Sequence, residues 1–229
     1  MTGEPGVSDG VAAVLAIDGG NSKTDVALIG WDGTVLAALR GPGASHEAYG
    51  IDGAMIRLGA MIAEVAVKAG LNGDGLIARH TSACLAGADL PEEEAMLASA
   101  LLDRGWSESA TALNDTFAVL RGGVDEPWGV AVTCGAGINC VAVAPSGAVA
   151  RYLSFGTLTG DWGGGVLEAR DPLLLAAIDR ELAKTAPGSA GRVLDAPPIA
   201  GAALLGLDHV GAGAVAHQCL RDYYRPGSA

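Results

Sequence analysis

The sequence is poor in aromatic side chains, which make up 4% of its 229 residues, whereas it contains 35 glycines. Half of the residues are hydrophobic, so a sizeable core is available, and it has to be close-packed from small aliphatic side chains. Basic residues are also scarce: 14 of them stand against 26 acidic residues, which gives a formal net charge of −12. This charge argues against nucleic acids and anionic membrane surfaces as partners.

Cysteine pairs, a signal sequence and long apolar runs are missing as well. The four cysteines, Cys84, Cys134, Cys140 and Cys219, form no C-x-x-C motif, which is typical of free thiols in a reducing compartment. Residues 1–10 are polar without an apolar signal core, and we expect them to be disordered. The longest apolar run, Ile199 to Leu207, is too short to span a bilayer. The sequence therefore predicts a cytoplasmic protein without a membrane partner.

Two common phosphate-binding motifs are absent. The sequence contains no G-x-x-x-x-G-K-[ST], which excludes a P-loop protein. Gly135-Ala136-Gly137 begins like a dinucleotide fingerprint, but Cys140 stands where the third glycine belongs. The residues that follow favour a strand over a helix, so the context of a Rossmann fold is missing too.

The most informative segment is Asp18-Gly19-Gly20-Asn21-Ser22-Lys23-Thr24, which lies between two short apolar runs. The runs predict two buried strands joined by a tight turn. Glycines allow the backbone to approach an anion closely, and Asn21, Ser22 and Thr24 add hydrogen-bond donors. Asp18 ends the first strand, where a carboxylate can hold a metal ion through water. The segment therefore indicates nucleotide phosphate chemistry.

The same pattern recurs in the second half of the chain. Val130 to Cys134 leads through Gly135-Ala136-Gly137 into a second apolar run, and Ser146-Gly147 makes a turn where Asp32-Gly33 did. We interpret this as an internal duplication of a hairpin and a third strand, so that two glycine turns grip a phosphate chain from both sides. The alternative is that glycine turns merely join strands; it explains a single hairpin equally well but is the weaker interpretation for two hairpins in matching register.

The rest of the chain alternates between helical and extended patterns. Apolar spacing predicts a helix over 52–69 and a strand over 79–86, and Pro91 opens a second helix. A short strand over 110–113 is followed by a helix to about residue 121. Further helices are expected at 166–184, from 198 to about 207, and from Asp208 onward.

Asn114-Asp115 lies at a strand-to-helix junction just before the second repeat. Phosphoryl transfer needs a group that orients a hydroxyl and accepts its proton, and Asp115 fits that role. The alternative is a helix N-cap. Its place between the two phosphate hairpins favours the catalytic interpretation.

Asp161 stands among glycines, in Gly160-Asp161-Trp162-Gly163-Gly164-Gly165, ahead of a predicted helix. A carboxylate there suits sugar hydroxyls, and here too an N-cap is the alternative.

As an ordered set, these motifs resemble those of the N-acetylglucosamine kinase group in the acetate/sugar kinase, Hsc70 and actin superfamily, which includes the BadF/BadG/BcrA/BcrD ATPases. The matching segments are 18–24, 114–115, 134–139, 160–165 and 195–205. The resemblance implies an α/β protein with a duplicated ribonuclease-H-like (actin-like ATPase) fold and a central cleft. Its domains would be a tail over 1–10, an N-terminal unit over 11–123 and a shortened C-terminal unit over 124–229.

The same resemblance implies a role for each motif. Asp115 would be the general base, and Asp18 would lie near Mg²⁺. ATP phosphates would contact Gly19, Gly20, Asn21, Ser22, Lys23 and Thr24 from the first hairpin, and Gly135, Ala136 and Gly137 from the second. The sugar would contact Asn114, Asn139 and Asp161, with Gly137, Ser45 and His46 as further candidates.

The implied function is transfer of the γ-phosphoryl group of ATP to a hydroxyl of an N-acetylhexosamine, with Mg²⁺ as cofactor. A small sugar is the expected partner, and a homodimer is the expected assembly. One rival is a BadF-type ATPase that activates another enzyme, although such proteins usually bring cysteines for an iron–sulfur cluster. Another is a catalytically inactive sugar-binding or regulatory protein.

Two departures from the family pattern bear on the choice among these functions. Ala136 replaces a common threonine, which removes a hydroxyl from the site. The relatives' long helical region with a Gly-Gly adenosine motif has no counterpart between Gly165 and Asp195, either through internal shortening or because the sequence is incomplete.

Overall fold

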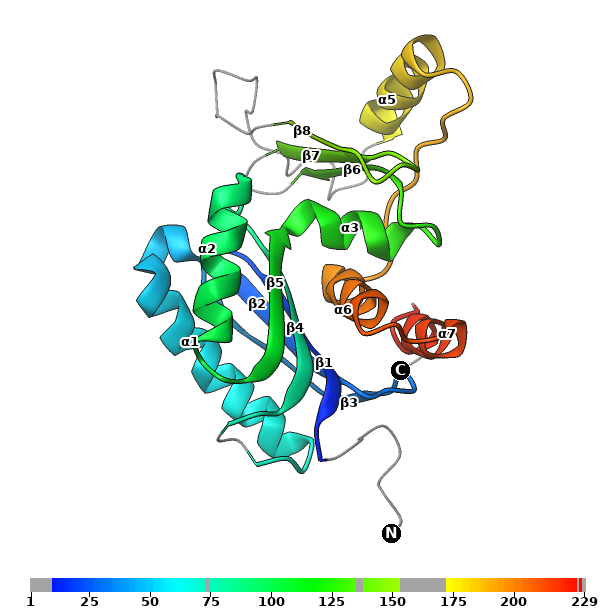
Figure 1. The fold of residues 1–229 in the computed structure, drawn as a ribbon. Helices are drawn as coiled ribbons and strands as arrows, with labels where there is room; N and C mark the ends of the chain where they lie inside the picture. The colour runs from blue at the N-terminus through cyan, green and yellow to red at the C-terminus, as the bar shows by residue number, and fades with distance from the viewer. Residues whose placement is uncertain (1–9, 73–74, 135–137, 153–171, 226, 228–229) are drawn as a thin grey trace.

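The computed structural model describes residues 10–72, 75–134, 138–152, 172–225 and 227. They form two β-sheets and several helices (Figure 1). The strands are β1 (Ala12–Gly19), β2 (Lys23–Ile29), β3 (Val35–Pro42), β4 (Ala78–Leu85), β5 (Ser107–Asn114), β6 (Gly129–Cys134), β7 (Ile138–Val143) and β8 (Val149–Tyr152). The helices are α1 (His46–Lys68), α2 (Pro91–Leu102), α3 (Asp115–Gly123), α5 (Pro172–Thr185), α6 (Pro198–His209) and α7 (Ala214–Tyr223).

The first sheet has five strands in the order β3-β2-β1-β4-β5. β1, β2 and β3 pair antiparallel, whereas β4 and β5 run parallel to β1 and to each other. β1 lies at the centre and is covered on both faces, which is why Ala12 to Ile17 is an unbroken apolar run and fully buried. The predicted first hairpin and its third strand are confirmed, and this strand order is ribonuclease-H-like, as expected.

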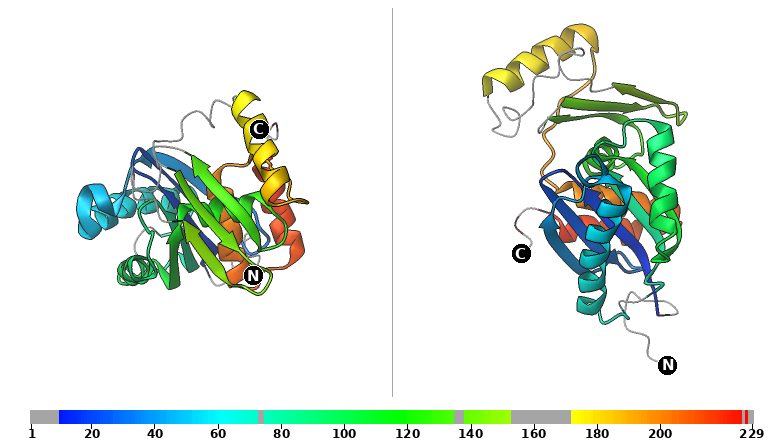
Figure 2. Two further views of the ribbon diagram at one scale, coloured as in Figure 1. Left: turned by 90° about the horizontal axis from the view of Figure 1, so that it is seen from above. Right: turned by 90° about the vertical axis from the view of Figure 1, so that its left-hand side faces the viewer.

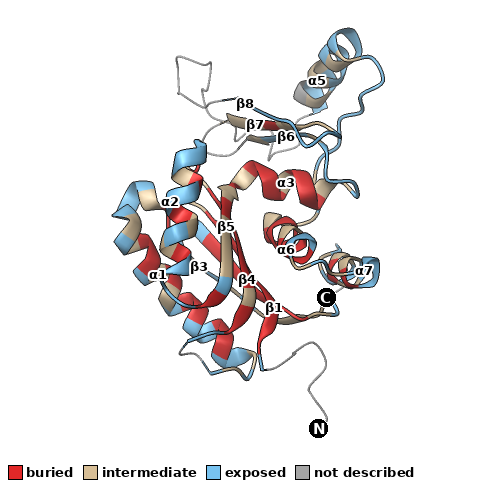
Figure 3. Ribbon diagram, in the orientation of Figure 1, coloured by how far each residue is buried: buried red, intermediate tan, exposed pale blue. Residues whose placement is uncertain are grey.

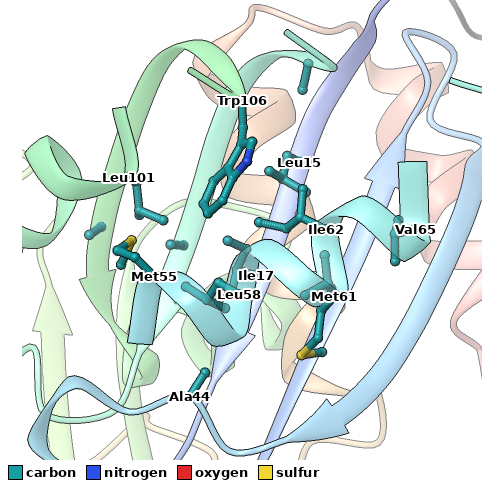
Figure 4. Close-up of a cluster of buried hydrophobic side chains, with 14 of the residues drawn as sticks. Leu15, Ile17, Ala44, Met55, Leu58, Met61, Ile62, Val65, Leu101 and Trp106 are labelled. Carbon is teal, nitrogen blue, oxygen red and sulfur yellow. The ribbon is translucent and has the colours of Figure 1, made fainter. Parts of the chain in front are cut away.

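The two faces of this sheet are covered by different helices. α1 and α2 pack on one face through a cluster in which Leu58 and Ile62 of α1 meet Leu15 and Ile17 of β1 (Figure 4). α6 packs on the other face, mainly against β1 and β4, and α7 packs beside it (Figures 1 and 2). Among the described residues, no helix is both long enough and apolar enough to cross a membrane.

The second sheet repeats the first three strands in the order β6-β7-β8, all antiparallel. This confirms the predicted second hairpin and its third strand. α3 joins the two sheets: it packs against α6 and also against β6 and β7 through Phe117 and Leu120. Val130, Val132 and Val149 remain exposed on the second sheet (Figure 3), as does Leu173 of α5.

Some boundaries differ from the prediction. α1 begins at His46 and not at residue 52, because the Ser45 hydroxyl accepts the backbone N–H of Glu47 and caps an extra first turn. Gly50, at φ +68°, separates this turn from the expected helix. Asp208 lies inside α6 and does not start the last helix, which begins at Ala214. The tail over 1–9 and residues 166–171 lie outside the described residues.

The division into units at residues 123 and 124 stays a prediction. The end of α3 falls at this boundary. However, α6 and α7, which the sequence assigned to the C-terminal unit, pack against the first sheet. The chain therefore returns to the first sheet after the second one.

Close contacts at glycines explain how a core with few aromatic residues is filled. A Cβ atom on Gly201 of α6 would lie 1.8 Å from the carbonyl oxygen of Ala118 in α3. A Cβ on Gly206 would lie 2.3 Å from a methyl group of Val14 in β1. The backbone of α6 thus lies directly against α3 and β1, an approach that any side chain would prevent.

We expect Gly201→Val to lower the free energy of unfolding by about 3 kcal/mol, because the valine side chain would force α6 away from α3. Chemical denaturation measures the loss. Gly213→Val is the matched control: Gly213 precedes α7, and nothing lies within 4 Å of its Cβ position. Equal losses in the two variants would contradict the proposed close contact between α3 and α6.

A buried histidine makes the fold sensitive to acid. His80 of β4 is fully buried, and its ring nitrogens lie 2.9 Å from the Ser109 hydroxyl and 3.1 Å from the Thr111 hydroxyl. Its ring stacks on His209 of α6 at a centroid distance of 3.7 Å. Burial, and then the charge of His209, lowers the pKa of His80 to about 4.

Acidification should therefore destabilise the fold through His80. As the pH falls from about 6.5 to about 4, the unfolded chain binds a proton at this residue and the native state does not, so stability falls by about 3 kcal/mol. The difference in unfolding free energy between the wild type and His80→Gln, measured from pH 7 to pH 4, isolates this effect. His46→Gln, which removes a half-buried histidine, is the control. A difference that does not change with pH would show that His80 is not held neutral.

Candidate functional site

The candidate site residues gather at one edge of the first sheet, where the parallel strands β1, β4 and β5 end. Asp18 is the penultimate residue of β1, and Asp115 follows β5 directly. Asp89 lies in the connection between β4 and α2. Ligands of open α/β sheets bind at the carboxyl ends of parallel strands, so a ligand-binding site is expected at this edge.

The helix cap next to Asp115 is Asn114. The Asn114 side-chain oxygen accepts the backbone N–H of Thr116 at 3.0 Å, and Asp115 is the first residue of α3. The N-cap alternative for Asp115 is therefore wrong, because its neighbour occupies that position. Burial, and then the negative charge of Asp89, raises the pKa of Asp115 to about 6, which is suitable for a base at neutral pH.

Asp18 lies close to other carboxylates at this edge. Burial, followed by the negative charges of Asp115 and Asp25, raises the pKa of Asp18 to about 7, although Lys23 and Arg40 act in the opposite direction. Asp25 has its own counter-ion, since both of its carboxylate oxygens accept hydrogen bonds from Arg40 at 2.7 and 2.8 Å. The charge of Asp18 is thus less well compensated than that of Asp25.

This environment fits a cation. A carboxylate that is partly buried among like charges gains stability when a positive ion lies near it. No three His, Cys, Asp or Glu side chains in the described part of the chain come together as a metal cage. Mg²⁺ is commonly held by one or two carboxylates, water and substrate phosphates, so Asp18 fits the role assigned to it by the motif.

The first glycine hairpin presents its turn to solvent. Asn21, Ser22 and Lys23 are exposed, whereas Thr24 is fully buried and its hydroxyl finds no partner among the described residues. The loop before α1 lies against this turn: a Cβ on Gly43 would be 1.9 Å from the carbonyl oxygen of Asn21. The loop before α1 therefore supports the backbone of the turn, while residues 21–23 are exposed.

Gly19 and Gly20 are needed for space rather than for a left-handed backbone, because neither has a positive φ. A Cβ on Gly19 would be 2.6 Å from a methyl group of Leu85, and a Cβ on Gly20 would be 3.2 Å from the carbonyl oxygen of Lys23.

Sequence reasoning missed Asp89, which connects two of the predicted site residues. One oxygen of its carboxylate accepts hydrogen bonds from the Asn114 side-chain nitrogen at 2.7 Å and from the Asn139 side-chain nitrogen at 3.0 Å. The only signal in the sequence was its position just after Gly87 at the end of a predicted strand. Asp89 thus joins β4, the start of α3 and β7 of the second sheet.

A second missed contact ties the two sheets together. Arg151 of β8 donates to both carboxylate oxygens of Glu94 in α2, each at 2.8 Å, and its guanidinium lies 5.0 Å from the centre of the Phe117 ring. Glu94 also accepts the backbone N–H of Asn114 at 3.0 Å. Nothing in the sequence around Glu94 or Arg151 indicates that the two residues are partners.

Ser45 and His46 do not line the pocket that contains Asp89, Asn114 and Asn139. They line another small pocket together with Gly19. Ser45 is buried as the cap of α1 and His46 is half-buried. Asn114 and Asn139 line a small polar pocket together with Asp89, Thr116 and Arg151. Gly135, Ala136, Gly137 and Asp161 lie outside the described residues, so their predicted roles stay predictions.

Comparisons with known proteins agree with this fold. No protein-family model matches the chain. Over 156 residues, the chain is 28% identical to the N-acetylmuramic acid/N-acetylglucosamine kinase of Clostridium acetobutylicum. The match covers 66% of this chain and 49% of that protein. It therefore spans about half the length of the curated relative that it matches.

A solved structure is similar over most of the chain. The crystal structure of a protein assigned as an N-acetylglucosamine kinase from Chromobacterium violaceum superposes with a TM-score of 0.57 and 20% identity, over 95% of this chain and 92% of that one. At this identity the structural match supports the fold alone. Together with the curated relative, it confirms the resemblance that the motifs predicted.

Proposed function

Since the chain is related to N-acetylglucosamine kinases in sequence and in fold, we propose that it transfers the γ-phosphoryl group of ATP to a hydroxyl of an N-acetylhexosamine. The observation that carries this proposal is the position of Asp115. It follows β5 at the edge where the parallel strands end, its neighbour Asn114 supplies the helix cap, and its pKa is raised to about 6.

In this proposal Asp115 accepts the proton of the sugar hydroxyl as the oxygen attacks phosphorus. A base with a pKa near 6 is ionised at neutral pH and still basic enough to assist the attack. Asn114, Asn139, Asp161, Ser45 and His46 are the proposed sugar contacts. The residues of the two phosphate hairpins, 19–24 and 135–137, are the proposed contacts to ATP phosphates.

Asp18 would hold Mg²⁺, either directly or through water. When bound, Mg²⁺ neutralises charge on the transferred phosphate. Asn21 and Ser22 are exposed at the turn, and Gly19 and Gly20 carry no side chain that would block the approach of a phosphate group.

The direct test is a kinase assay that identifies the product. The protein is incubated with Mg²⁺ and ATP and with N-acetylglucosamine, N-acetylmuramic acid or glucose, and sugar phosphate is measured by mass spectrometry. We expect an acetamido sugar to be phosphorylated, and we expect Asp115→Asn to abolish the product. ADP release that is independent of every sugar would favour the BadF-type ATPase and overturn the proposal.

A second candidate is a sugar-binding homologue without catalytic activity. It is favoured by the lack of a counterpart of the family's adenosine motif between Gly165 and Asp195. Calorimetry distinguishes the candidates: the kinase binds both sugar and Mg²⁺–ATP, whereas the sugar-binding protein binds sugar alone.

The positions of the cysteines argue against the BadF-type ATPase. Cys84, Cys140 and Cys219 lie on β4, β7 and α7, and Cys84 is fully buried. In the part of the chain that the structure describes, no three His, Cys, Asp or Glu side chains come together, so these cysteines do not cluster with one another.

A further inference from the structure

Asp89 is the meeting point of three segments that are far apart in the sequence. It lies between β4 and α2, Asn114 ends β5, and Asn139 belongs to β7 of the second sheet. A single carboxylate oxygen of Asp89 accepts from both asparagine side chains, at 2.7 and 3.0 Å. No hydrogen bond among the described residues joins Asn114 directly to Asn139, so the two side chains are connected through Asp89.

The hydrogen bonds determine which way each amide points. The Asn114 side-chain oxygen accepts the backbone N–H of Thr116, and the Asn139 side-chain oxygen accepts the backbone N–H of Cys140 at 2.8 Å. A backbone N–H can only donate and a carboxylate can only accept, so exchanging the oxygen and nitrogen of either amide would break both of its contacts. Each side-chain nitrogen keeps a second hydrogen that Asp89 does not use.

We propose that Asp89 is a positioning residue that holds the amides of Asn114 and Asn139 as hydrogen-bond donors for an oxygen atom of the bound sugar. This inference rests on the proposed function, in which both asparagines contact the sugar. All three residues line the same small pocket. Asp89 itself does not need to touch the substrate.

The surroundings hold Asp89 in place before any ligand binds. The backbone N–H groups of Asp89 and Leu90 both donate to the Glu93 carboxylate, at 3.0 and 2.9 Å. The ion pair between Glu94 and Arg151 holds the second sheet beside α2, so that β7 brings Asn139 to the Asp89 carboxylate. The donors are therefore oriented in advance, which reduces the entropy lost on binding.

Two substitutions at Asp89 distinguish the positioning of the asparagine amides from structural support alone. Asp89→Asn keeps a carbonyl oxygen that can accept from both amides, whereas Asp89→Ala removes the acceptor. We expect Asp89→Ala to raise KM for the sugar about 10- to 100-fold, because two amides lose their orientation, while kcat and KM for ATP change less than about 5-fold. Asp89→Asn should restore most of the sugar KM.

Asp208→Ala is the matched control. The Asp208 carboxylate also accepts from two side chains, Arg121 and His217, but it belongs to α6. Its loss should lower stability and leave KM for the sugar unchanged. If Asp89→Ala proves unable to fold, Asp89→Ser carries the same expectation, since a serine hydroxyl is too short to reach both amides. An unchanged sugar KM in a folded Asp89→Ala or Asp89→Ser variant would overturn the inference.

A measurement without substrate tests the positioning separately from the proposed function. The chain has four asparagines and one glutamine, so the side-chain amide signals in a nitrogen–proton NMR spectrum can be assigned by substitution. We expect the Asn114 and Asn139 amide protons to exchange slowly with solvent in the wild type and in Asp89→Asn, and at least about 10-fold faster in Asp89→Ala. Equal exchange in all three proteins would overturn the positioning by Asp89. Slow exchange in a protein that neither binds nor phosphorylates sugars would instead contradict the proposed function alone.

Discussion

Replacing Asp115 by asparagine is expected to lower kcat for sugar phosphorylation by about 10²- to 10⁴-fold while the fold is retained. The amide has nearly the same size as the carboxylate but cannot accept the proton of the attacking hydroxyl. Because Asn114 and not Asp115 caps α3, the substitution leaves the helix N-terminus intact. Steady-state kinetics together with a melting curve measure the two effects.

The pH dependence of the wild type gives an independent check on Asp115. Its pKa of about 6 predicts that kcat/KM rises with pH through this region, since only the ionised carboxylate acts as a base. Asp103→Asn, at the exposed end of α2, is the control and should behave like the wild type. An Asp115→Asn variant with wild-type turnover, or a pH profile that is flat between 5 and 7, would show that Asp115 is not the base.

The parts of the site that lie close together in the sequence could be predicted from it. The turn at Gly19-Gly20 between two apolar runs indicated the hairpin of β1 and β2, which the structure contains. Asn114-Asp115 was placed correctly at a strand-to-helix junction, although which of the two residues caps the helix depends on backbone angles. Local hydrophobic periodicity and turn chemistry are sufficient for features of this kind.

The long-range contacts could not be predicted in the same way. Arg151 is separated from Glu94 by 57 positions and Asn139 from Asp89 by 50, and nothing in either segment encodes its partner. The return of α6 to the first sheet was missed for a similar reason. A helix from 198 to about 207 was predicted, but the sequence does not show that Gly201 and Gly206 allow its close approach to α3 and β1.

Asp18→Asn is expected to remove activity and to increase stability at the same time. The Asp18 carboxylate is partly buried and held near Asp115 and Asp25, and its pKa of about 7 lies far above the ordinary value of 3.8. Its ionisation at neutral pH therefore costs folding free energy, which the neutral amide does not. After allowance for partial exposure to solvent, we expect a gain of roughly 2 kcal/mol at pH 8.

The pH dependence gives the sign of this effect. A group whose pKa is raised in the folded state destabilises the fold as the pH rises from the unfolded value toward the folded one. The advantage of Asp18→Asn should thus be near zero at pH 4, where the native carboxyl is protonated, and should reach its full value above pH 7. Asp32→Asn is a matched control, because the hydrogen bonds of Thr34 lower the pKa of Asp32 and its replacement should bring no gain.

The functional consequence should be opposite to the gain in stability. If Asp18 holds Mg²⁺, its replacement should reduce turnover by at least about 10²-fold, and Mg²⁺–ATP should raise the melting temperature of the wild type but not that of Asp18→Asn. The acidic edge of the first sheet would then be a site where stability is sacrificed for metal binding. A variant that is more stable at pH 8 but still gains stability from Mg²⁺–ATP would show that the charge of Asp18 is costly for another reason and that the metal is held elsewhere.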